Sequence, residues 1–485
     1  MRSTPSIPRD ARLAVTAWGL LATALAIPAA AEDPPALKEV KVAAVNERIH
    51  CAAEPDYSYA LYLPPGYGKG PPPPVLFVLD AAGRGVETLE RFRPAAERYG
   101  WILASSWNSL SDEGSEGTPA AVAALVEDVE RRFPFDRDRV YLTGMSGTSR
   151  LAWAFGMAMR PHSAGVIGVV GALPNRQAPP PEVGFAYFGT SGWFDYNYTE
   201  MRDLDAALDG VADAPHRFEF FDGGHQWAPE ATLGRAVGWL ELQAMRSGRR
   251  AKDPELIREL YDADRERAES LEAAEPLAAL DLYRSMAEDY SGLLEAEALS
   301  VSIEALERSP EVKQGRRLAR RLVRQENAYR SALAEWVVTS RNASPLPLTH
   351  AKSRGILQIE PLGKLSRDDD PRIVRSAQRR LALAFGQAMH YFPEELWAQD
   401  EYKKAAASLE VAVEIAPEHG RAWYRLARAQ VKAGDRSRAL EALGKAVDHG
   451  YTDLAKVEGD PWLEPLRSTE GYRRAVAALA TAGSR

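Results

Sequence analysis

Cysteine is almost absent from the sequence: Cys51 is the only one among 485 residues, so no disulfide can form within the chain. We expect Cys51 to be a small buried hydrophobic residue. The sequence also lacks a His-Glu-x-x-His pattern, paired cysteines and a phosphate-binding glycine loop, so we predict neither a metal site nor a cofactor. It has no long basic run and its formal net charge is −8, which argues against nucleic-acid binding.

Long apolar runs are also scarce. One of them, Leu13–Ile27, follows three arginines near the N-terminus and is shorter than the ~20 residues that a membrane span needs. The small residues Ala29–Ala31 follow it, as in a signal cleavage site. We therefore predict that residues 1–31 are a secretory signal peptide, that the mature protein is periplasmic or secreted, and that no membrane span remains after cleavage. An uncleaved N-terminal anchor is the alternative.

Residues 32–249 alternate short β-rich apolar runs with amphipathic segments. The expected strands are Tyr57–Leu63, Pro74–Asp80, Trp101–Ser105, Arg139–Gly144, Gly165–Val170, Gly184–Gly189 and His216–Phe221. The expected helices are Gly85–Arg98, Pro119–Arg132, Ser149–Met159, Thr199–Leu208 and Ala228–Gln243. Continuous apolar runs such as Val75–Leu79 are typical of parallel strands covered on both faces. We therefore predict an α/β domain with a doubly wound, mostly parallel sheet.

From Arg250 onward strand signals nearly vanish, and Ala, Leu, Glu and Arg recur with helical spacing. We predict a helical domain over residues 250–380, with a degenerate helical pair around Ala279 and Tyr283, and a separate helical-repeat domain over residues 381–485. The expected architecture is therefore an α/β domain followed by an all-α part.

Residues 381–485 contain an internal repeat. Three pairs of apolar residues share a spacing of about 34 residues, a period typical of stacked helical hairpins. The pairs are Ala405 and Ala439, Leu409 and Leu443, and Ala412 and Ala446. The pattern resembles the tetratricopeptide repeat over roughly Glu395–Tyr451, although Gln430 stands where the consensus has an aromatic residue. An ordinary helical bundle is the alternative.

A candidate nucleophile lies in Gly144-Met145-Ser146-Gly147-Thr148, between an apolar β-run and a helical segment. Flanking glycines permit a strained turn that holds the serine Oγ at the carboxyl end of a sheet, facing a helix N-terminus. The pattern resembles the Gly-x-Ser-x-Gly elbow of the α/β-hydrolases, except that Thr148 replaces the last glycine. This resemblance implies that Ser146 is a nucleophile, and a plain glycine-rich turn is the alternative.

A histidine follows the last expected strand, in Gly223-Gly224-His225-Gln226-Trp227. A histidine on a short loop beyond a strand suits a general base, which must reach the serine hydroxyl and pass the proton onward. The segment resembles the base loop of secreted esterases such as the polyhydroxybutyrate depolymerase and feruloyl esterase groups. We predict that His225 is the general base, and a structural loop histidine is the alternative.

The α/β-hydrolases order their triad as serine, acid and histidine, so the acid is expected between the nucleophile and the base. Gly192-x-x-Asp195 lies beyond an expected strand and looks like the acid loop of the family. The acid accepts the imidazole N–H and fixes the tautomer. Asp203 and Asp205 compete for this role but lie within a helical pattern, and Asp195 as a surface or capping residue is a further alternative.

An oxyanion hole needs two backbone donors, and the first is expected to be the N–H of Gly147. The second is expected from the loop after the strand that ends at Asp80. Many relatives begin this loop with His-Gly, whereas this chain has Asp80-Ala81. We predict Ala82 as the second donor, with Ala81 as the alternative.

Aromatic and amide side chains near these loops are candidates for lining an acyl or alcohol pocket. The candidates are Trp107, Asn108, Trp193 and Tyr196. Aromatic residues are also common in plain cores, so a packing role is the alternative.

The pattern as a whole predicts an exported serine esterase that acts on small-molecule or polymeric esters through a Ser-Asp-His triad and an acyl-enzyme. The same triad can also cleave peptides or thioesters. A different reading is a catalytically silent hydrolase scaffold whose repeat tail binds a protein or peptide partner.

Overall fold

The computed structural model describes residues 40–111, 117–174, 177–295, 297–343 and 347–482. The predicted signal peptide, residues 1–31, lies outside these ranges. By its internal contacts the chain forms two compact units: residues up to Trp193 with Asn197–Arg316, and Phe194–Tyr196 with Arg317–Arg485. Within the described ranges, no helix has both the length and the hydrophobicity to span a bilayer.

The first unit is built on an eight-stranded sheet with the order β1-β2-β4-β3-β5-β6-β7-β8. Its strands are β1 Val45–His50, β2 Ser58–Tyr62, β3 Val75–Leu79, β4 Ile102–Ser106, β5 Val140–Met145, β6 Ser163–Val169, β7 Ala186–Gly192 and β8 His216–Phe221. β2 pairs antiparallel with β1 and β4, and all the other pairs are parallel. The predicted fold class, a mostly parallel doubly wound sheet, is confirmed.

The strand order places a topological switch point between β3 and β5. The chain passes from β3 to β4 on one side of β3, whereas β5 lies on the other side. In open α/β sheets, ligands bind in the crevice at the carboxyl ends of such strands. The loops after β3 and β5 are therefore where the fold favours a site.

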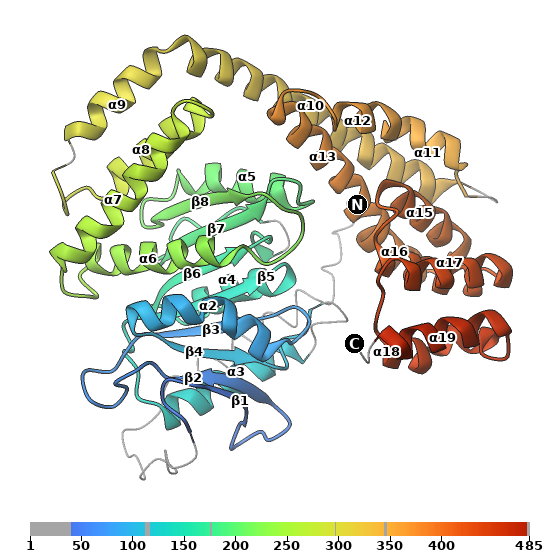
Figure 1. Ribbon diagram of the computed structural model, residues 1–485, viewed down its shortest axis with the longest axis horizontal. Coiled ribbons are helices and arrows are strands. Elements are labelled where there is room, and N and C mark those ends of the chain that lie inside the picture. The colour runs from blue at the N-terminus through green and yellow to red at the C-terminus, as the bar shows by residue number, and fades with distance from the viewer. Residues whose placement is uncertain (1–39, 112–116, 175–176, 296, 344–346, 483–485) are drawn as a thin grey trace, which may run out of the picture. The chain divides into compact units, whose positions relative to one another are not determined.

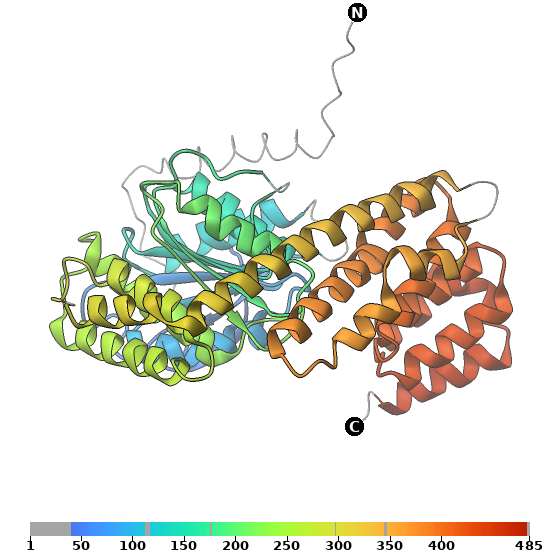
Figure 2. The same cartoon turned by 90° about the horizontal axis from the view of Figure 1, so that it is seen from above.

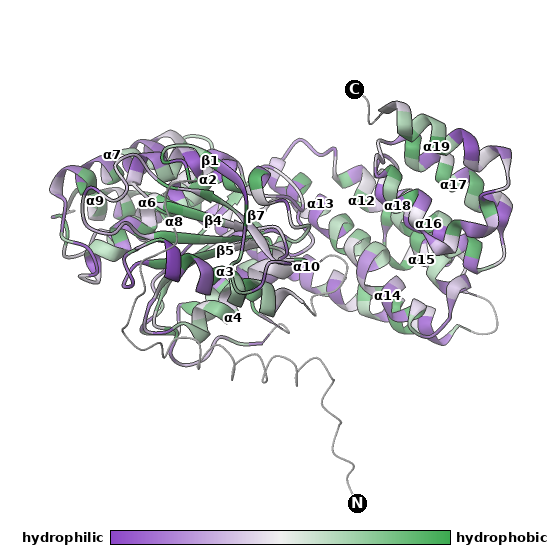
Figure 3. Cartoon of the chain, turned by 90° about the horizontal axis from the view of Figure 1, so that it is seen from below, coloured by the Kyte–Doolittle hydropathy of each residue, from purple (hydrophilic) through white to green (hydrophobic). Residues whose placement is uncertain are grey.

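Helices cover both faces of the sheet (Figure 1). α2 (Gly85–Tyr99) and α6 (Glu230–Arg246) bury apolar side chains against one face. α3 (Thr118–Arg132), α4 (Gly147–Ala158) and α5 (Tyr198–Leu208) bury theirs against the other. The strands between them are mostly hydrophobic (Figure 3). Cys51 is 2% exposed in one of these cores, which confirms the expectation of a buried residue.

Three further helices complete the first unit: α7 (Pro254–Leu271), α8 (Pro276–Asp289) and α9 (Glu297–Arg308). Buried ion pairs attach α7 and α8 to the edge strand β8. Arg217 on β8 lies 2.9 Å from Asp264 and 3.5 Å from Asp289. Burial lowers the pKa of Arg217, but these carboxylates outweigh it and hold the pKa above its ordinary value. The edge strand is thereby covered by helices.

All regular secondary-structure elements described in the second unit are helices. α10 (Pro310–Asn342) begins in the first unit and ends in the second. The helices that follow are α11 His350–Ile356, α12 Ile359–Leu365, α13 Pro371–Gly386, η3 Gln387–Tyr391, α14 Phe392–Trp397, α15 Tyr402–Ile415, α16 Gly420–Lys432, α17 Arg436–Asp448, α18 Leu454–Gly459, η4 Pro461–Leu466 and α19 Glu470–Ala482. They stack side by side, coloured orange to red in Figure 2. Ala405 and Ala439, the first repeat pair, are both fully buried, as small residues between closely packed helices should be.

Candidate active site

Ser146 occupies a strained turn between β5 and α4. Its φ and ψ are 58° and −119°, a combination that non-glycine residues rarely adopt. Neighbouring backbone lies very close: a Cβ on Gly171 would be 2.3 Å from the carbonyl oxygen of Ser146. A Cβ on Gly144 would likewise lie 2.3 Å from the carbonyl oxygen of Thr148. The glycines allow this close approach, and the turn holds Ser146 at the carboxyl end of β5 and at the N-terminus of α4.

Thr148, the departure from the Gly-x-Ser-x-Gly motif, is fully buried and its hydroxyl is used inside the turn. Thr148 Oγ1 accepts a hydrogen bond from the N–H of Met145 at 3.0 Å. It also lies 2.8 Å from the carbonyl oxygens of Met145 and Leu79, one of which takes its proton. The threonine therefore joins the serine turn to the end of β3.

His225 lies on the loop between β8 and α6, and its Nε2 is 2.9 Å from Ser146 Oγ. Both residues are partly exposed, so a substrate can reach them. With the imidazole proton on Nδ1, Nε2 accepts the hydrogen bond from the serine hydroxyl. The predicted nucleophile and base are thus brought together in the geometry that proton transfer requires.

The loop that follows β7 begins beside the loop that carries His225. The N–H of Trp193 donates to the carbonyl oxygen of Phe221 at 2.8 Å, and a Cβ on Gly192 would lie 2.2 Å from the Gly223 carbonyl oxygen. Asp195 follows on this β7 loop and is 1% exposed. Its assignment as the triad acid stays a prediction.

The competing carboxylates on α5 face other partners. Asp203 pairs with Arg202 at 3.0 Å and is largely exposed. Asp205 lies 3.7 Å from Nε2 of His216, on the first residue of β8. Burial, together with the nearby Asp209, raises the pKa of Asp205 to about 6 despite the opposing effect of His216. Asp205 is therefore an interaction partner of His216 at the amino end of β8.

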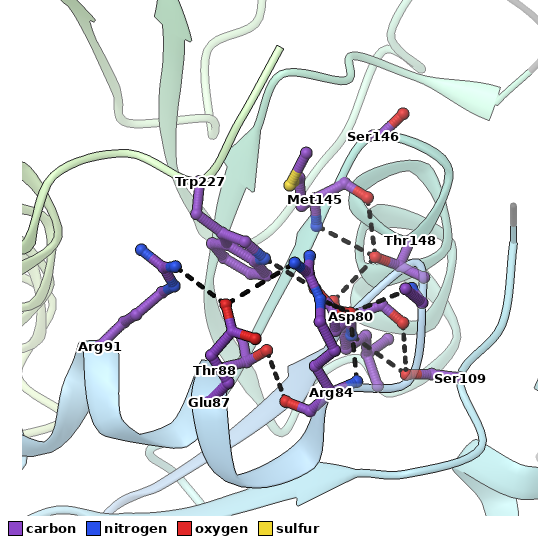
Figure 4. A network of polar contacts seen from close by, with 12 residues as sticks. Asp80, Arg84, Glu87, Thr88, Arg91, Ser109, Met145, Ser146, Thr148 and Trp227 are labelled. Carbon is purple, nitrogen blue, oxygen red and sulfur yellow. Dashed lines mark hydrogen bonds and ion pairs between the residues drawn. The ribbon is translucent and has the colours of Figure 1, made fainter. Parts of the chain in front are cut away.

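A network of polar contacts surrounds Asp80, directly after β3 (Figure 4). Asp80 is fully buried. Its Oδ1 accepts from the N–H groups of Ala82 and Arg84, and both carboxylate oxygens accept from the Arg84 guanidinium. Its Oδ2 also accepts from the indole N–H of Trp227, on the same loop as His225, at 2.8 Å. Burial raises the pKa of Asp80, but the hydrogen bonds from Arg84 and Trp227 outweigh it and hold the pKa below its ordinary value.

This network corrects the prediction that Ala82 supplies the second oxyanion donor. The Ala82 N–H donates to Asp80 Oδ1 at 3.0 Å, so it is not available to a substrate oxygen. The alternative, Ala81, is linked to the serine turn through Ser111. Its carbonyl oxygen accepts from the N–H of Ser111 at 3.0 Å, and a Cβ on Gly147 would lie 2.5 Å from Ser111 Oγ. Ser111 thus bridges Ala81 and Gly147.

Two of the predicted substrate-binding residues use their polar groups inside the protein. The Trp107 indole donates to the carbonyl oxygen of Glu47 at 2.9 Å, and its ring packs against Gly85, where a Cβ would lie 2.7 Å from it. Asn108 Oδ1 accepts from the N–H of Ser58 at 2.9 Å. Trp107 thus connects β1 with the residues after β3, and Asn108 contacts the first residue of β2. A contact of either residue with substrate stays a prediction.

The other two predicted substrate-binding residues flank Asp195. The Trp193 ring packs on Phe220 and Tyr198, with centroids 5.3 and 5.6 Å apart. Tyr196 belongs by its contacts to the second unit, where its ring lies 5.8 Å from that of His390. Their contact with substrate also stays a prediction.

The contacts of two residues in this region, Asp80 and Ser111, were not predicted from the sequence. Asp80 carried a signal, because a carboxylate that ends an entirely apolar strand needs a buried partner. Ser111 carried none, because nothing in its sequence neighbourhood places it against Gly147.

The strand order and the serine turn after β5 define the first unit as an α/β-hydrolase fold. In the second unit, the family model of the tetratricopeptide repeat matches residues 396–458, which confirms the predicted repeat over roughly Glu395–Tyr451.

Comparison with whole proteins gives similarities to solved structures, whereas no curated protein matches the chain. The chain is similar to the substrate-bound fluorophosphonate-binding serine hydrolase F of Staphylococcus aureus, with 14% identity over 38% of this chain and 92% of that chain, at a TM-score of 0.32. It is similar to a carboxylesterase from Mesorhizobium loti, with 16% identity over 40% of this chain and 99% of that chain, at a TM-score of 0.32. A ferulic acid esterase is 16% identical over 37% of this chain and 88% of its own, at a TM-score of 0.31.

Proposed function

We propose that the first unit hydrolyses carboxylic esters through an acyl-enzyme formed on Ser146. The observation that carries the proposal is the 2.9 Å contact between Ser146 Oγ and His225 Nε2, made by a serine on a strained turn. A serine hydroxyl is a weak nucleophile unless a base takes its proton during attack. The contact supplies that base, and the partial exposure of both residues leaves room for a carbonyl carbon to approach.

In the first half of the reaction, Ser146 Oγ attacks the ester carbonyl carbon while its proton passes to His225 Nε2. The carbonyl oxygen becomes an oxyanion, which we assign to the N–H groups of Gly147 and Ala81. The tetrahedral intermediate then breaks its bond to the alkoxy oxygen, and His225 protonates the departing alcohol. Asp195, the predicted acid, accepts the N–H of His225 Nδ1 and stabilises the imidazolium.

In the second half, a water molecule loses a proton to His225 Nε2 and adds to the acyl carbon. The second tetrahedral intermediate releases the carboxylic acid, and Ser146 recovers the proton from His225. The N-terminus of α4, where Gly147 is the first residue, adds a favourable dipole next to the oxyanion. Removal of one such donor costs roughly 10²- to 10³-fold in kcat in enzymes of this chemistry.

A fluorophosphonate probe tests this function directly, because it phosphonylates an activated serine. We expect the wild-type protein to be labelled, Ser146→Ala to lose labelling, and Ser163→Ala to keep it. Ser163 is a matched control because it is fully buried at the amino end of β6. Hydrolysis of p-nitrophenyl esters of graded chain length, a feruloyl ester and a peptide then ranks ester against peptide substrates. Folded wild-type protein that resists the probe overturns the proposal.

A second function is proposed for the helical-repeat unit, the binding of a protein or peptide. It is supported by the family model match over residues 396–458 and by a groove of about 420 Å³ on α15, α16 and α17. Glu410, Glu414, Trp423 and Gln430 are among its lining residues.

Export is proposed from the N-terminal signal pattern. The molecular mass of the chain isolated from a periplasmic fraction tests export, since cleavage after Ala31 shortens the chain.

A further inference from the structure

We propose that Asp80 is a positioning residue that joins the loop of the general base to the loop of the oxyanion donors. The inference rests on the proposed ester hydrolysis. The Asp80 carboxylate reaches two loops far apart in sequence, the loop after β3 and the loop that carries His225. Oδ2 accepts from Trp227 at 2.8 Å, and Oδ1 accepts from the Ala82 N–H at 3.0 Å.

The Asp80 carboxylate is buried and accepts hydrogen bonds at both of its oxygens. Asp80 is 0% exposed, and five N–H contacts from Ala82, Arg84 and Trp227 surround its two oxygens. Arg84 supplies three of these contacts, from its backbone N–H, Nε and Nη2. A buried charge with this many donors is held rigidly, because each lost contact leaves a desolvated oxygen without a partner. Groups bonded to Asp80 are therefore fixed relative to one another.

Trp227 is the connection to the general base. It lies on the short loop that carries His225, between β8 and α6, and is 4% exposed. Its ring packs edge-on against Phe92 of α2 at 5.9 Å. The residues before His225 are Gly223 and Gly224, which tolerate many backbone conformations. The indole hydrogen bond to Asp80 limits that freedom and sets where the imidazole lies.

The same carboxylate shapes the oxyanion side. By accepting the Ala82 N–H it removes that donor from the site and fixes the turn in which Ala81 lies. The residue before Asp80, Leu79, has its carbonyl oxygen 2.8 Å from the hydroxyl oxygen of Thr148 in the serine turn. The end of β3 therefore holds all three loops: nucleophile through Thr148, base through Trp227, and oxyanion donors through Asp80 itself (Figure 4).

A purely structural role for this network would lower stability and leave catalysis of the folded protein intact. If Asp80 positions the base, loss of its hydrogen bonds lowers kcat and changes KM little, because the base is displaced while the contacts with substrate are kept. Trp227→Phe separates the two, because phenylalanine keeps an aromatic ring against Phe92 and removes the N–H donor.

The chain offers a matched control in Trp239. Its indole N–H donates to buried Asp289 at 2.8 Å, and its ring packs edge-on against Phe188 at 5.8 Å. Trp239→Phe therefore removes the same kind of hydrogen bond from a similar environment outside the catalytic loops. We expect Trp227→Phe to lower kcat for a p-nitrophenyl ester by roughly 10- to 100-fold with KM within about 3-fold. We expect Trp239→Phe to leave kcat within about 2-fold of the wild-type value. The two variants should shift the midpoint of urea unfolding by similar amounts.

Asp80→Asn is the second variant, measured whether or not Trp227→Phe folds. Ala82 and Trp227 donate to different oxygens of Asp80, and in asparagine one of these two atoms becomes an NH2 donor that faces another N–H. The same selective fall in kcat is expected. Equal kcat in Trp227→Phe and Trp239→Phe, or an Asp80→Asn variant with unchanged kcat, overturns the positioning role.

Labelling of the wild type by the fluorophosphonate probe separates this inference from the proposed function. If the wild type is labelled and hydrolyses esters, and Trp227→Phe has an unchanged kcat, only the positioning role is overturned. A folded wild type that neither labels nor hydrolyses esters defeats both.

Discussion

His225 Nε2 lies 2.9 Å from Ser146 Oγ, although the two residues are 79 positions apart in the chain. The distance is that of a hydrogen bond, and it is made between loops that leave β5 and β8 at the same edge of the sheet. Parallel strands bring such loops together, because their carboxyl ends all point the same way. In the proposed mechanism this pair supplies the nucleophile and its general base.

Loss of the base should abolish ester hydrolysis without unfolding the protein. We expect His225→Ala to lower kcat for a p-nitrophenyl ester by about 10⁴-fold or more, because Ser146 then has no proton acceptor. His162→Ala, on the same unit, serves as the control and should keep activity. Steady-state kinetics with circular dichroism of both variants checks this, and an active His225→Ala enzyme contradicts it.

The hydroxyl of Thr148 should be needed for the serine turn. Thr148→Val keeps the volume but leaves the N–H of Met145 without its acceptor, and one of the Met145 and Leu79 carbonyl oxygens without its donor. Each unsatisfied buried group costs about 1–3 kcal/mol, so for the two groups we expect a loss of roughly 2–6 kcal/mol in unfolding free energy and a reduced kcat. Thr148→Ser retains the hydroxyl and should recover most of both. Urea denaturation measures the loss, and equal stability of the valine and serine variants refutes the role.

Glu219 on β8 should make stability depend on pH in the acid range. Burial raises its pKa, but Arg267, Arg217 and Arg235 outweigh that effect and hold the pKa below the ordinary 4.5. A carboxyl whose folded pKa is lowered stabilises the fold above its unfolded pKa, and this stability is lost as pH falls through the folded pKa. Wild type should therefore exceed Glu219→Gln in unfolding free energy at neutral pH, with the gap closing below about pH 4. Urea titrations at several pH values measure the gap, and a gap that is independent of pH rules out this linkage.

Arg217 should be essential for the attachment of α7 and α8 to β8. Arg217→Met leaves Asp264 and Asp289 buried without their cation, at a cost of about 3–5 kcal/mol. The control is Arg93→Met, which removes an exposed pair with Glu90 and should cost about 0–1 kcal/mol. Thermal unfolding of the two variants is the measurement. Similar losses in both variants mean that the buried pairs do not hold these helices.

Apolar patterning made most of the sheet predictable. The expected strand His216–Phe221 is β8 with the same bounds, and the expected Pro74–Asp80 contains β3. The expectation missed β1, Val45–His50, because this edge strand is half exposed and carries Asn46, Glu47 and Arg48 instead of an apolar run. Edge strands pair on one side only, so hydrophobicity marks them weakly.

The candidate nucleophile and base were also readable from the chain, because the elbow and the Gly-Gly-His loop are local patterns. The second oxyanion donor was not. Ala82 is small and in the expected loop, but its N–H is taken by the carboxylate of Asp80. A side chain that captures a nearby backbone donor leaves no mark in the spacing of residues.

The sequence by itself determined what short-range patterns encode: the mostly parallel sheet, the helical repeat, and the local turns that carry Ser146 and His225. Only the tertiary structure decided which groups from distant segments share hydrogen bonds, as in the Asp80 contact with Trp227 across 147 positions. Hydrophobic periodicity follows from neighbours along the chain, whereas the partner of a buried polar group depends on which loops the folded sheet brings to one edge.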